Sequence, residues 1–193
     1  MLDNFIGIIN VSQIYKKQRT SMNKGYILLM AAMLFTALQT SAKSFEIDRT
    51  TARDVELKRY MGRWYEIARF DHSFERNLEY CEAFYALHDD GTISVTNTGI
   101  NTKTERRKTA YGKAKPGDQP GQLRVSFFWF FYSDYNILAL DEEYEWALVG
   151  SKSERYLWIL ARTRHLDSKT RNNIVAIAAS RGYDTSKLIW VRQ

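Results

Sequence analysis

The feature that most constrains this chain is a series of short segments in which apolar and polar residues alternate. Such alternation is typical of β-strands, because successive side chains of a strand point to opposite faces. Local turns join the segments, with no long crossover between them. Eight segments follow one another, over residues 62–70, 80–88, 92–99, 108–115, 122–128, 134–140, 144–150 and 155–162. The pattern predicts an all-β domain whose sequential strands pair antiparallel.

The turns and the number of segments together predict a closed barrel. Asp89-Asp90-Gly91 is a strong hairpin signal, and residues 116–121 hold both prolines of the chain. Eight antiparallel strands are about the number at which a sheet closes on itself and holds one small ligand. We therefore expect an eight-stranded up-and-down antiparallel barrel. In its first strand, strict alternation predicts one shared face for Trp64, Glu66, Ala68 and Phe70.

A helix is predicted after the last barrel strand. It begins at an N-cap, Asp167 or Ser168, and ends at Gly182. Its apolar face carries Ile174, Ile177 and Ala178. We expect this face to pack against the outside of the barrel, and residues 187–191 to add a short final strand at its edge.

The first 42 residues differ in character from the rest of the chain. A positive charge, an apolar run over residues 26–38 and small residues at 40–42 are the three parts of a secretory signal. The run is shorter than the ~20 residues of a membrane-spanning helix, so a signal peptide is favoured over a membrane anchor. We expect residues 1–42 to be an upstream extension and signal peptide, with Met22 as the true start. Residues 43–193 then form a single domain.

Cysteine and charge exclude several classes of protein. Cys81 is the only cysteine, which rules out an internal disulfide and a cysteine-rich zinc site. The three histidines are scattered without ligand spacing, so no metal and no cofactor are expected. Part of the formal net charge of +6 lies in the first 42 residues, so the charge of the chain gives little support for nucleic-acid binding. Arg106-Arg107-Lys108 is the densest basic run, read as a solvated rim or as a contact with anionic headgroups.

Three separated stretches resemble the signature motifs of the lipocalins. They are Gly62-Arg63-Trp64-Tyr65, Ser133-Asp134-Tyr135 and Leu157-Trp158-Ile159-Leu160-Ala161-Arg162. Longer runs over residues 60–70, 136–141 and 156–163 are similar to the branch that holds bacterial lipocalin, plant temperature-induced lipocalin and apolipoprotein D. The similarity covers residues 54–193.

The resemblance implies a structural role for the signature residues Gly62, Trp64, Asp134 and Arg162. In particular, it implies that Arg162 lies across the Trp64 indole at the closed end, a cation–π contact of about 1 kcal/mol or more. It further implies storage or transport of lipids in the cell envelope, as a carrier and not an enzyme. Members of the bacterial branch are commonly lipid-anchored, but this leader has no acceptor cysteine. We therefore expect an exported protein, periplasmic or associated with the outer membrane, without a lipid anchor.

The expected ligand is a small hydrophobic molecule, a fatty acid or a lysophospholipid, bound inside the barrel. Burial of acyl CH₂ groups contributes roughly 0.8 kcal/mol each, so chain length matters more than the headgroup. The predicted ligand-binding residues are Tyr85, Asn97, Leu123, Val125, Phe127, Trp129, Tyr135, Trp158 and Leu160. Asn97 and Glu66 either bond a headgroup or are satisfied structural groups.

Residues 127–132 form a run of six aromatic side chains, which the strand count places at the open mouth. Alternation sends half of them outward, so some are expected at the surface. Such a patch would be a portal for an acyl chain, a lip that touches a membrane, or a contact between two copies. The alternative is that the loop folds back and fills the core.

Two other classes of function are alternatives to a carrier. Cys81 is predicted to face inward, and one lipocalin, prostaglandin D synthase, uses an inward cysteine of the second strand as its nucleophile. Nothing in the sequence places a base beside Cys81, and a lone buried cysteine is usually an apolar filler. The second alternative is a protein-interaction or dimerisation module that uses residues 127–132.

Overall fold

The computed structural model describes residues 46–128 and 130–193. The upstream extension and signal peptide predicted for residues 1–42 lie outside the described residues, as does the predicted ligand-binding residue Trp129. In the described part of the chain, no helix combines the length and the apolar character that a membrane crossing requires.

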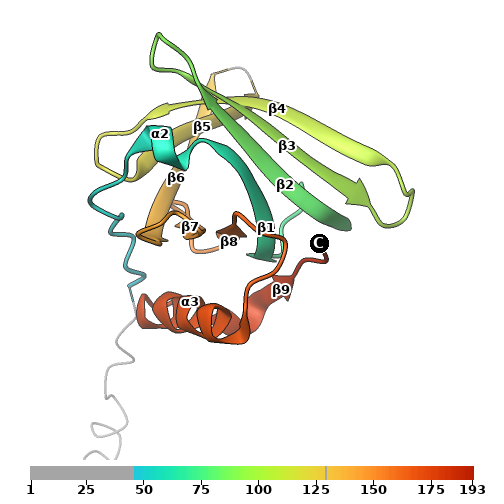
Figure 1. Cartoon of the computed structure of the whole chain (residues 1–193). Helices are drawn as coiled ribbons and strands as arrows, with labels where there is room; N and C mark the ends of the chain where they lie inside the picture. The colour runs from blue at the N-terminus through green and yellow to red at the C-terminus, as the bar shows by residue number, and fades with distance from the viewer. Residues whose placement is uncertain (1–45, 129) are drawn as a thin grey trace, which may run out of the picture. The chain divides into compact units, whose positions relative to one another are not determined.

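Eight antiparallel strands close into a barrel, as the alternation predicted (Figure 1). Each strand pairs with the next, and β1 pairs with both β2 and β8, which closes the sheet. The strands are β1 (Gly62–Phe70), β2 (Leu78–Leu87), β3 (Ile93–Asn101), β4 (Arg107–Pro116), β5 (Gln122–Phe128), β6 (Phe131–Leu140), β7 (Trp146–Gly150) and β8 (Leu157–Ala161).

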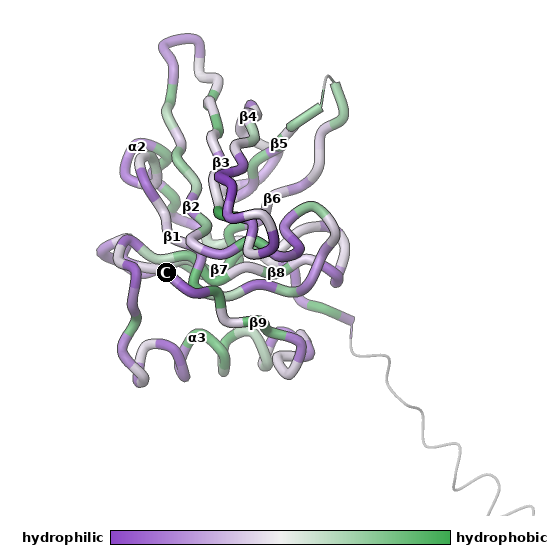
Figure 2. Tube along the Cα trace, turned by 90° about the vertical axis from the view of Figure 1, so that its right-hand side faces the viewer, coloured by the Kyte–Doolittle hydropathy of each residue, from purple (hydrophilic) through white to green (hydrophobic). Residues whose placement is uncertain are grey.

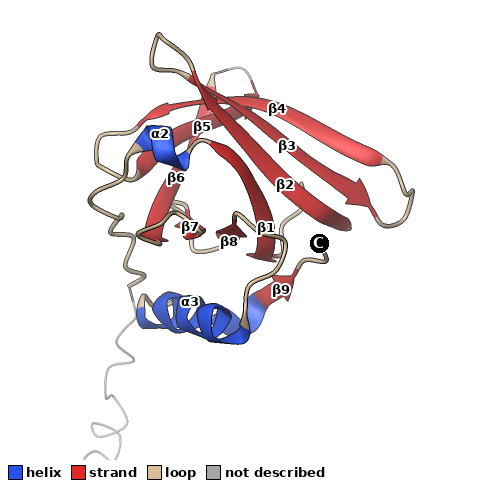
Figure 3. Cartoon of the chain, in the orientation of Figure 1, coloured by secondary structure: helices blue, strands red, loops and turns tan. Residues whose placement is uncertain are grey.

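The remaining elements lie before and after the barrel strands (Figure 3). They are α2 (Leu57–Tyr60), α3 (Ser168–Ser180), the 3-10 helix η1 (Thr185–Lys187) and β9 (Leu188–Trp190). Helix α3 begins where the sequence predicted, because the Asp167 side chain accepts hydrogen bonds from the backbone N–H groups of Lys169 and Thr170. The predicted final strand is also present, as β9 at the edge of β1.

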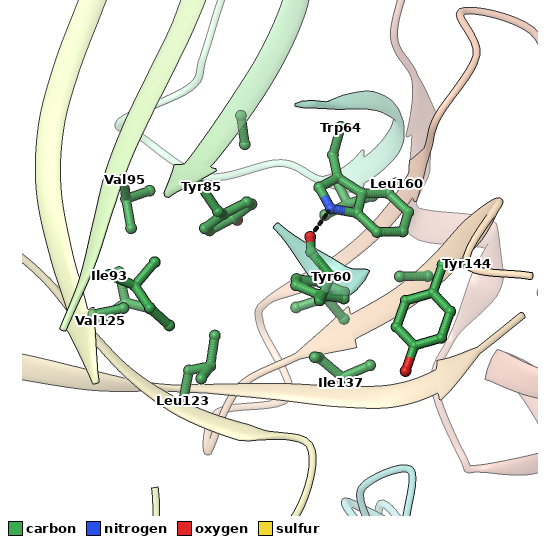
Figure 4. Packing of buried hydrophobic residues seen from close by; sticks show 14 residues of the cluster. Tyr60, Trp64, Tyr85, Ile93, Val95, Leu123, Val125, Ile137, Tyr144 and Leu160 are labelled. Carbon is green, nitrogen blue, oxygen red and sulfur yellow. Dashed lines mark hydrogen bonds between the residues drawn. The ribbon is translucent and has the colours of Figure 1, made fainter. Parts of the chain in front are cut away.

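The buried apolar residues form two layers on opposite sides of the sheet. The interior core includes Tyr60, Trp64, Ile93, Leu123, Val125 and Leu160, shown in Figure 4. The outer core packs the other face of the sheet against α3, through Ile174 and Ala178 of the helix. Alternate residues of β8 belong to the two cores, which is the arrangement that the period of two predicts.

Strand β1 departs from strict alternation, and the predicted shared face is wrong. A bulge between Glu66 and Ala68 inserts one extra residue, so the side chains that follow change sides. Trp64 lies in the interior core, whereas Ala68 and Phe70 lie in the outer core with α3. Arg69 therefore shares the inner side with Glu66, and its Nη1 donates a buried 2.5 Å hydrogen bond to Oε1 of Glu66.

The closed end is built around Trp64, which is fully buried. The Arg162 guanidinium carbon lies 3.9 Å from the centre of the indole, as the resemblance implies. The same guanidinium donates hydrogen bonds of 2.7 Å to the carbonyls of Arg59 and Arg63. Gly62, the first residue of β1, has φ +93°, a conformation that favours glycine, and it lies two residues before Trp64. Asp134, the other signature residue, pairs across strands with Arg124 at 3.3 Å.

We predict that Arg162→Ala lowers the free energy of unfolding by about 2–4 kcal/mol, because it removes the cation–π contact and leaves backbone carbonyls without their donor. Urea unfolding measures the change. Arg164→Ala is the matched control, since its guanidinium lies 4.8 Å from the Tyr65 ring, outside the closed end. A similar loss in both variants would contradict a special role for Arg162.

Candidate functional site

The interior of the barrel is packed at one end and accessible to solvent at the other. On β3 and β4, the inward-facing side chains of Ile93, Val95 and Ala114 are buried. Further along the same face, Asn97 is half-buried and its cross-strand partner Ala110 is exposed. The accessible end is the mouth of the barrel, opposite Trp64.

Strand β5 shows the same gradient along its inner face. The exposed fraction rises from 1% at Leu123 to 9% at Val125 and 44% at Phe127. Gly112 is opposite Phe127, where a Cβ atom would come within 2.8 Å of the phenyl ring. The absence of a side chain at Gly112 thus lets the ring approach β4 closely at the mouth.

The packed end has a floor of hydrogen-bonded tyrosines. The hydroxyl of Tyr135 lies 2.6 Å from that of Tyr60 and accepts a 3.1 Å hydrogen bond from Tyr85. Burial raises the pKa of Tyr85 to about 12, so its hydroxyl is neutral at physiological pH. These three rings close the bottom of the interior together with Trp64.

The structure divides the predicted ligand-binding residues between these two levels. Tyr85, Leu123, Val125 and Leu160 belong to the interior core, and Tyr135 packs against it. Asn97, Phe127 and Trp158 are more accessible and lie nearer the mouth. The Oδ1 atom of Asn97 is buried without a hydrogen-bond partner among the described residues.

A cluster of titratable side chains lies on the inner side of β1, and only Glu66 of it could be named as a candidate from the sequence. Besides Glu66 it contains Arg69, and His72 and Glu75 from the loop between β1 and β2. Arg69 donates to the backbone carbonyls of Glu75 and Leu78, which folds the loop back onto the barrel. The bulge that turns Arg69 inward carries no signal in the alternation, so the cluster could not be located from sequence.

The two carboxyl groups of this cluster titrate in opposite directions. Burial and the neighbouring Glu75 carboxylate raise the pKa of Glu66 to about 8, against the opposing effect of Arg69. Burial also acts to raise the pKa of Glu75, but contacts with His72, Trp158 and Arg69 outweigh it and lower that pKa. At neutral pH the cluster therefore holds one ionised carboxylate, that of Glu75, and a largely protonated Glu66.

The C-terminal tail closes the gap where β1 and β2 separate. Their pairing ends at Tyr65 and Glu82, and beyond it the Val191 N–H donates to the Ile67 carbonyl. The Gln193 side-chain amide donates 2.7 Å hydrogen bonds to the carbonyls of Glu66 and Cys81, one on each strand.

Cys81 faces inward as predicted, but its surroundings do not activate it. The thiol is buried, and burial raises the pKa of Cys81 far above its ordinary value, with Glu66 adding to the shift. A thiol acts as a nucleophile when its pKa is lowered, so this environment favours a structural role. Among residues 46–128 and 130–193, no group of three or more His, Cys, Asp and Glu side chains is placed to hold a metal ion.

The phenylalanines that the structure describes in the aromatic run do not fold back into the core. Phe128, Phe130 and Phe131 are exposed at the tip of the β5–β6 hairpin, and Tyr111 of β4 is exposed as well. Figure 2 shows this tip as a hydrophobic segment. The ammonium groups of Lys113 and Lys115 lie 5.8 and 5.1 Å from the centre of the Tyr132 ring, so the apolar tip has a basic flank. The exposed residues Phe128, Phe130 and Phe131 thus form a lip at the mouth, which we call the aromatic lip.

The comparisons with known proteins agree on one family. Residues 55–193 match the model of a lipocalin-like domain. The outer membrane lipoprotein Blc of Citrobacter freundii is 47% identical over 146 residues, which cover 75% of this chain and 82% of that protein. Temperature-induced lipocalin-1 of Arabidopsis thaliana is 37% identical over 158 residues, covering 77% and 83%. The name of the bacterial relative is contrary to the expectation of a protein without a lipid anchor.

Solved structures agree on the fold. The major allergen Per a 4 from cockroaches superposes with a TM-score of 0.62 over 77% of this chain and 95% of the allergen. The sequences are 19% identical, so the likeness shows the fold alone.

We predict that Glu66→Gln becomes more stable relative to the unsubstituted protein as pH rises from about 5 to 8. A carboxyl group whose pKa is raised by folding contributes stability below its unfolded pKa, and that contribution is lost as pH rises through the folded value of about 8. Glutamine carries no proton to lose and keeps an oxygen for Arg69. Urea unfolding at several pH values should show a difference on the order of a few kcal/mol by pH 8. Parallel stability curves would refute the buried protonated carboxyl.

Proposed function

The chain belongs to the lipocalin-like domain family, and from that premise we propose that it binds and carries amphiphilic lipids, fatty acids or lysophospholipids, inside its barrel. The observation that supports this most directly is the gradient of burial along the inner face. An apolar wall rises from the tyrosine floor to Phe127, which is still half-exposed at the mouth. An acyl chain that enters from the mouth would bury CH₂ groups against this wall.

The energetics favour a long chain over a short one. Each buried CH₂ group contributes roughly 0.8 kcal/mol, so about ten of them supply roughly 8 kcal/mol, the free energy of micromolar binding before the cost of association is subtracted. Further CH₂ groups are needed to offset that cost. We propose that Asn97, Phe127 and Trp158 contact the ligand near the mouth, and that Trp129, which lies outside the described residues, is a further ligand contact. The deeper contacts are assigned to Tyr85, Leu123, Val125, Tyr135 and Leu160.

We place this activity in the cell envelope, because the bacterial relatives at 43–47% identity are named outer membrane lipoproteins. An envelope carrier must collect its ligand from a lipid surface, since long-chain amphiphiles partition strongly out of water.

The aromatic lip is the part of the barrel best suited to contact such a surface. Exposed phenyl rings insert at a bilayer interface, and basic side chains beside them attract anionic headgroups. Lys113 and Lys115 flank the lip, and the basic run at residues 106–108 lies exposed at the start of β4. We propose that the lip touches the bilayer while ligand passes through the mouth. A second copy of the chain is the other candidate occupant of the lip.

Filling the mouth should weaken lipid binding. We predict that Ala110→Trp weakens the binding of a fluorescent long-chain fatty acid by about tenfold or more, because the new indole takes the place of the acyl chain. Tyr111→Trp is the matched control, since the neighbouring residue points to the other face of β4. Displacement titrations measure both affinities. Equal affinities for the two variants would argue against binding inside the barrel.

Substitution of the aromatic lip should release the protein from membranes. We predict that Phe128→Ser with Phe131→Ser lowers binding to vesicles of anionic phospholipid by about tenfold, because two exposed rings no longer insert. Vesicle co-sedimentation measures the change, and sedimentation velocity of the unsubstituted protein reports the second candidate. A dimer that becomes monomeric in the variant, with no vesicle binding in either protein, would assign the lip to a contact between copies.

A further inference from the structure

The Glu75 carboxylate occupies an unusual position, because a loop carries it into the mouth of the barrel. Its side chain is only 12% exposed, although the loop connects two strands at the open end. Oε2 accepts a 3.1 Å hydrogen bond from the Trp158 indole and lies 3.0 Å from Nε2 of His72. A surface loop rarely buries a carboxylate without a reason, since desolvation of the charge is costly.

The groups around this carboxylate come from three separate elements. Arg69 is on β1, His72 is in the loop, and Trp158 is on β8, directly across from Arg69 in the sheet. The side chains of Arg69 and His72 are 4% and 5% exposed. The sheet therefore holds Arg69 and Trp158 in place whether or not the loop is closed.

The surrounding groups are not fully satisfied by Glu75. Within the described residues, neither imidazole nitrogen of His72 has an aligned hydrogen bond, and Nε of Arg69 has no partner. The 3.0 Å contact between His72 and Glu75 is thus close but poorly directed. Buried polar groups are nearly always hydrogen-bonded, so these atoms have capacity for another acceptor.

The electrostatics of the position favour a single negative charge. The groups that face Glu75 are Arg69 and His72, with the Trp158 N–H, and together they lower the pKa of Glu75 in spite of burial. The other acidic group of the cluster is Glu66, and the Cys81 thiol lies 4.0 Å from Nη1 of Arg69; the pKa of each is raised. At pH 7 both are largely protonated, so neither places a second full negative charge beside Arg69.

The position also matches where the head of a bound amphiphile would lie. Trp158 packs against the interior core, so its indole joins the apolar wall to the charged cluster. His72 stacks on Phe74 at 4.0 Å and lies 5.2 Å from the Trp158 ring, which completes a mixed apolar and polar rim. An acyl chain along the wall would bring its polar end to this rim.

We propose that Arg69, His72 and Trp158 form an anion subsite that takes the carboxylate or phosphate head of an amphiphile, and that Glu75 occupies it when no ligand is bound. The inference rests on the proposed lipid binding and specifies its polar contact. A ligand head displaces Glu75 and inherits its donors, so Glu75 acts as an internal competitor. Removal of Glu75 then favours anionic heads over neutral ones.

The test compares three amphiphiles with the same sixteen-carbon chain length: hexadecanoate, hexadecyl phosphate and the neutral hexadecanol. Each displaces an uncharged fluorescent lipid probe from the unsubstituted protein and from Glu75→Ala at pH 7, below its critical micelle concentration. The readout is the ratio of anionic to neutral affinity. Glu75→Ala should raise this ratio by about tenfold, because a charge-assisted acceptor no longer competes. A higher ratio for both anions would indicate a subsite that accepts anions in general. A higher ratio for only one of them would show whether the subsite prefers a carboxylate or a phosphate head.

The donors are tested in the background that has lost the competitor. Trp158→Phe keeps an apolar ring but loses the N–H donor. Adding it to Glu75→Ala should therefore lower the ratio of anionic to neutral affinity again, most of the way to that of the unsubstituted protein. Glu154→Ala removes an exposed carboxylate from another loop and is the matched control, with no change in the ratio expected. If Glu75→Ala does not fold, as judged by circular dichroism, Glu75→Gln removes the charge with the shape retained.

The outcomes separate the subsite from the proposed function. An unchanged ratio, or an equal gain for hexadecanol that reports only an opened loop, would overturn the subsite while lipid binding stands. Failure of all three amphiphiles to displace the probe, or of the probe to bind, would overturn the proposed function and the subsite together.

Discussion

The contact between the Arg162 guanidinium and the Trp64 indole joins the end of the last barrel strand to the start of the first. The first and last strands have no turn between them and meet only through tertiary contacts, so this contact adds to the β1–β8 pairing that closes the sheet. The indole also fills the closed end of the interior, where its centre lies 4.9 Å from that of the tilted Tyr60 ring. With one end closed by side chains, any ligand must use the other.

The bulge in β1 is what gives the open end its chemistry. Before it, the strand contributes Trp64 to the interior core; after it, Ala68 and Phe70 pack against α3 and Arg69 turns inward. A single inserted residue thus turns the large apolar side chains of the second half of β1 to the outer face. It also turns the Arg69 side chain to the inner face, near the mouth. Burial of that arginine requires partners, and Glu66 and the loop carbonyls supply them.

The mouth therefore has two sides with different properties. The β5–β6 side is the aromatic lip, apolar and exposed, with lysines at its flank. The β1–β8 side is the buried cluster of Arg69, His72 and Glu75, which favours one anion. An amphiphile has the same division, an apolar chain and a polar head, so the arrangement suits a molecule that leaves a lipid surface and enters chain first.

The strands, the capped helix and the closed barrel could all be predicted from the sequence, because a period of two, turn residues and an N-cap are local properties of the chain. So could the signature pair Trp64 and Arg162, through the family motifs. The cluster at the mouth could not, since a bulge shifts the phase of β1 with no mark in its alternation, and the loop that carries His72 and Glu75 reads only as polar. Which polar residues become buried is decided when distant strands meet, because burial depends on neighbours that the local sequence does not contain.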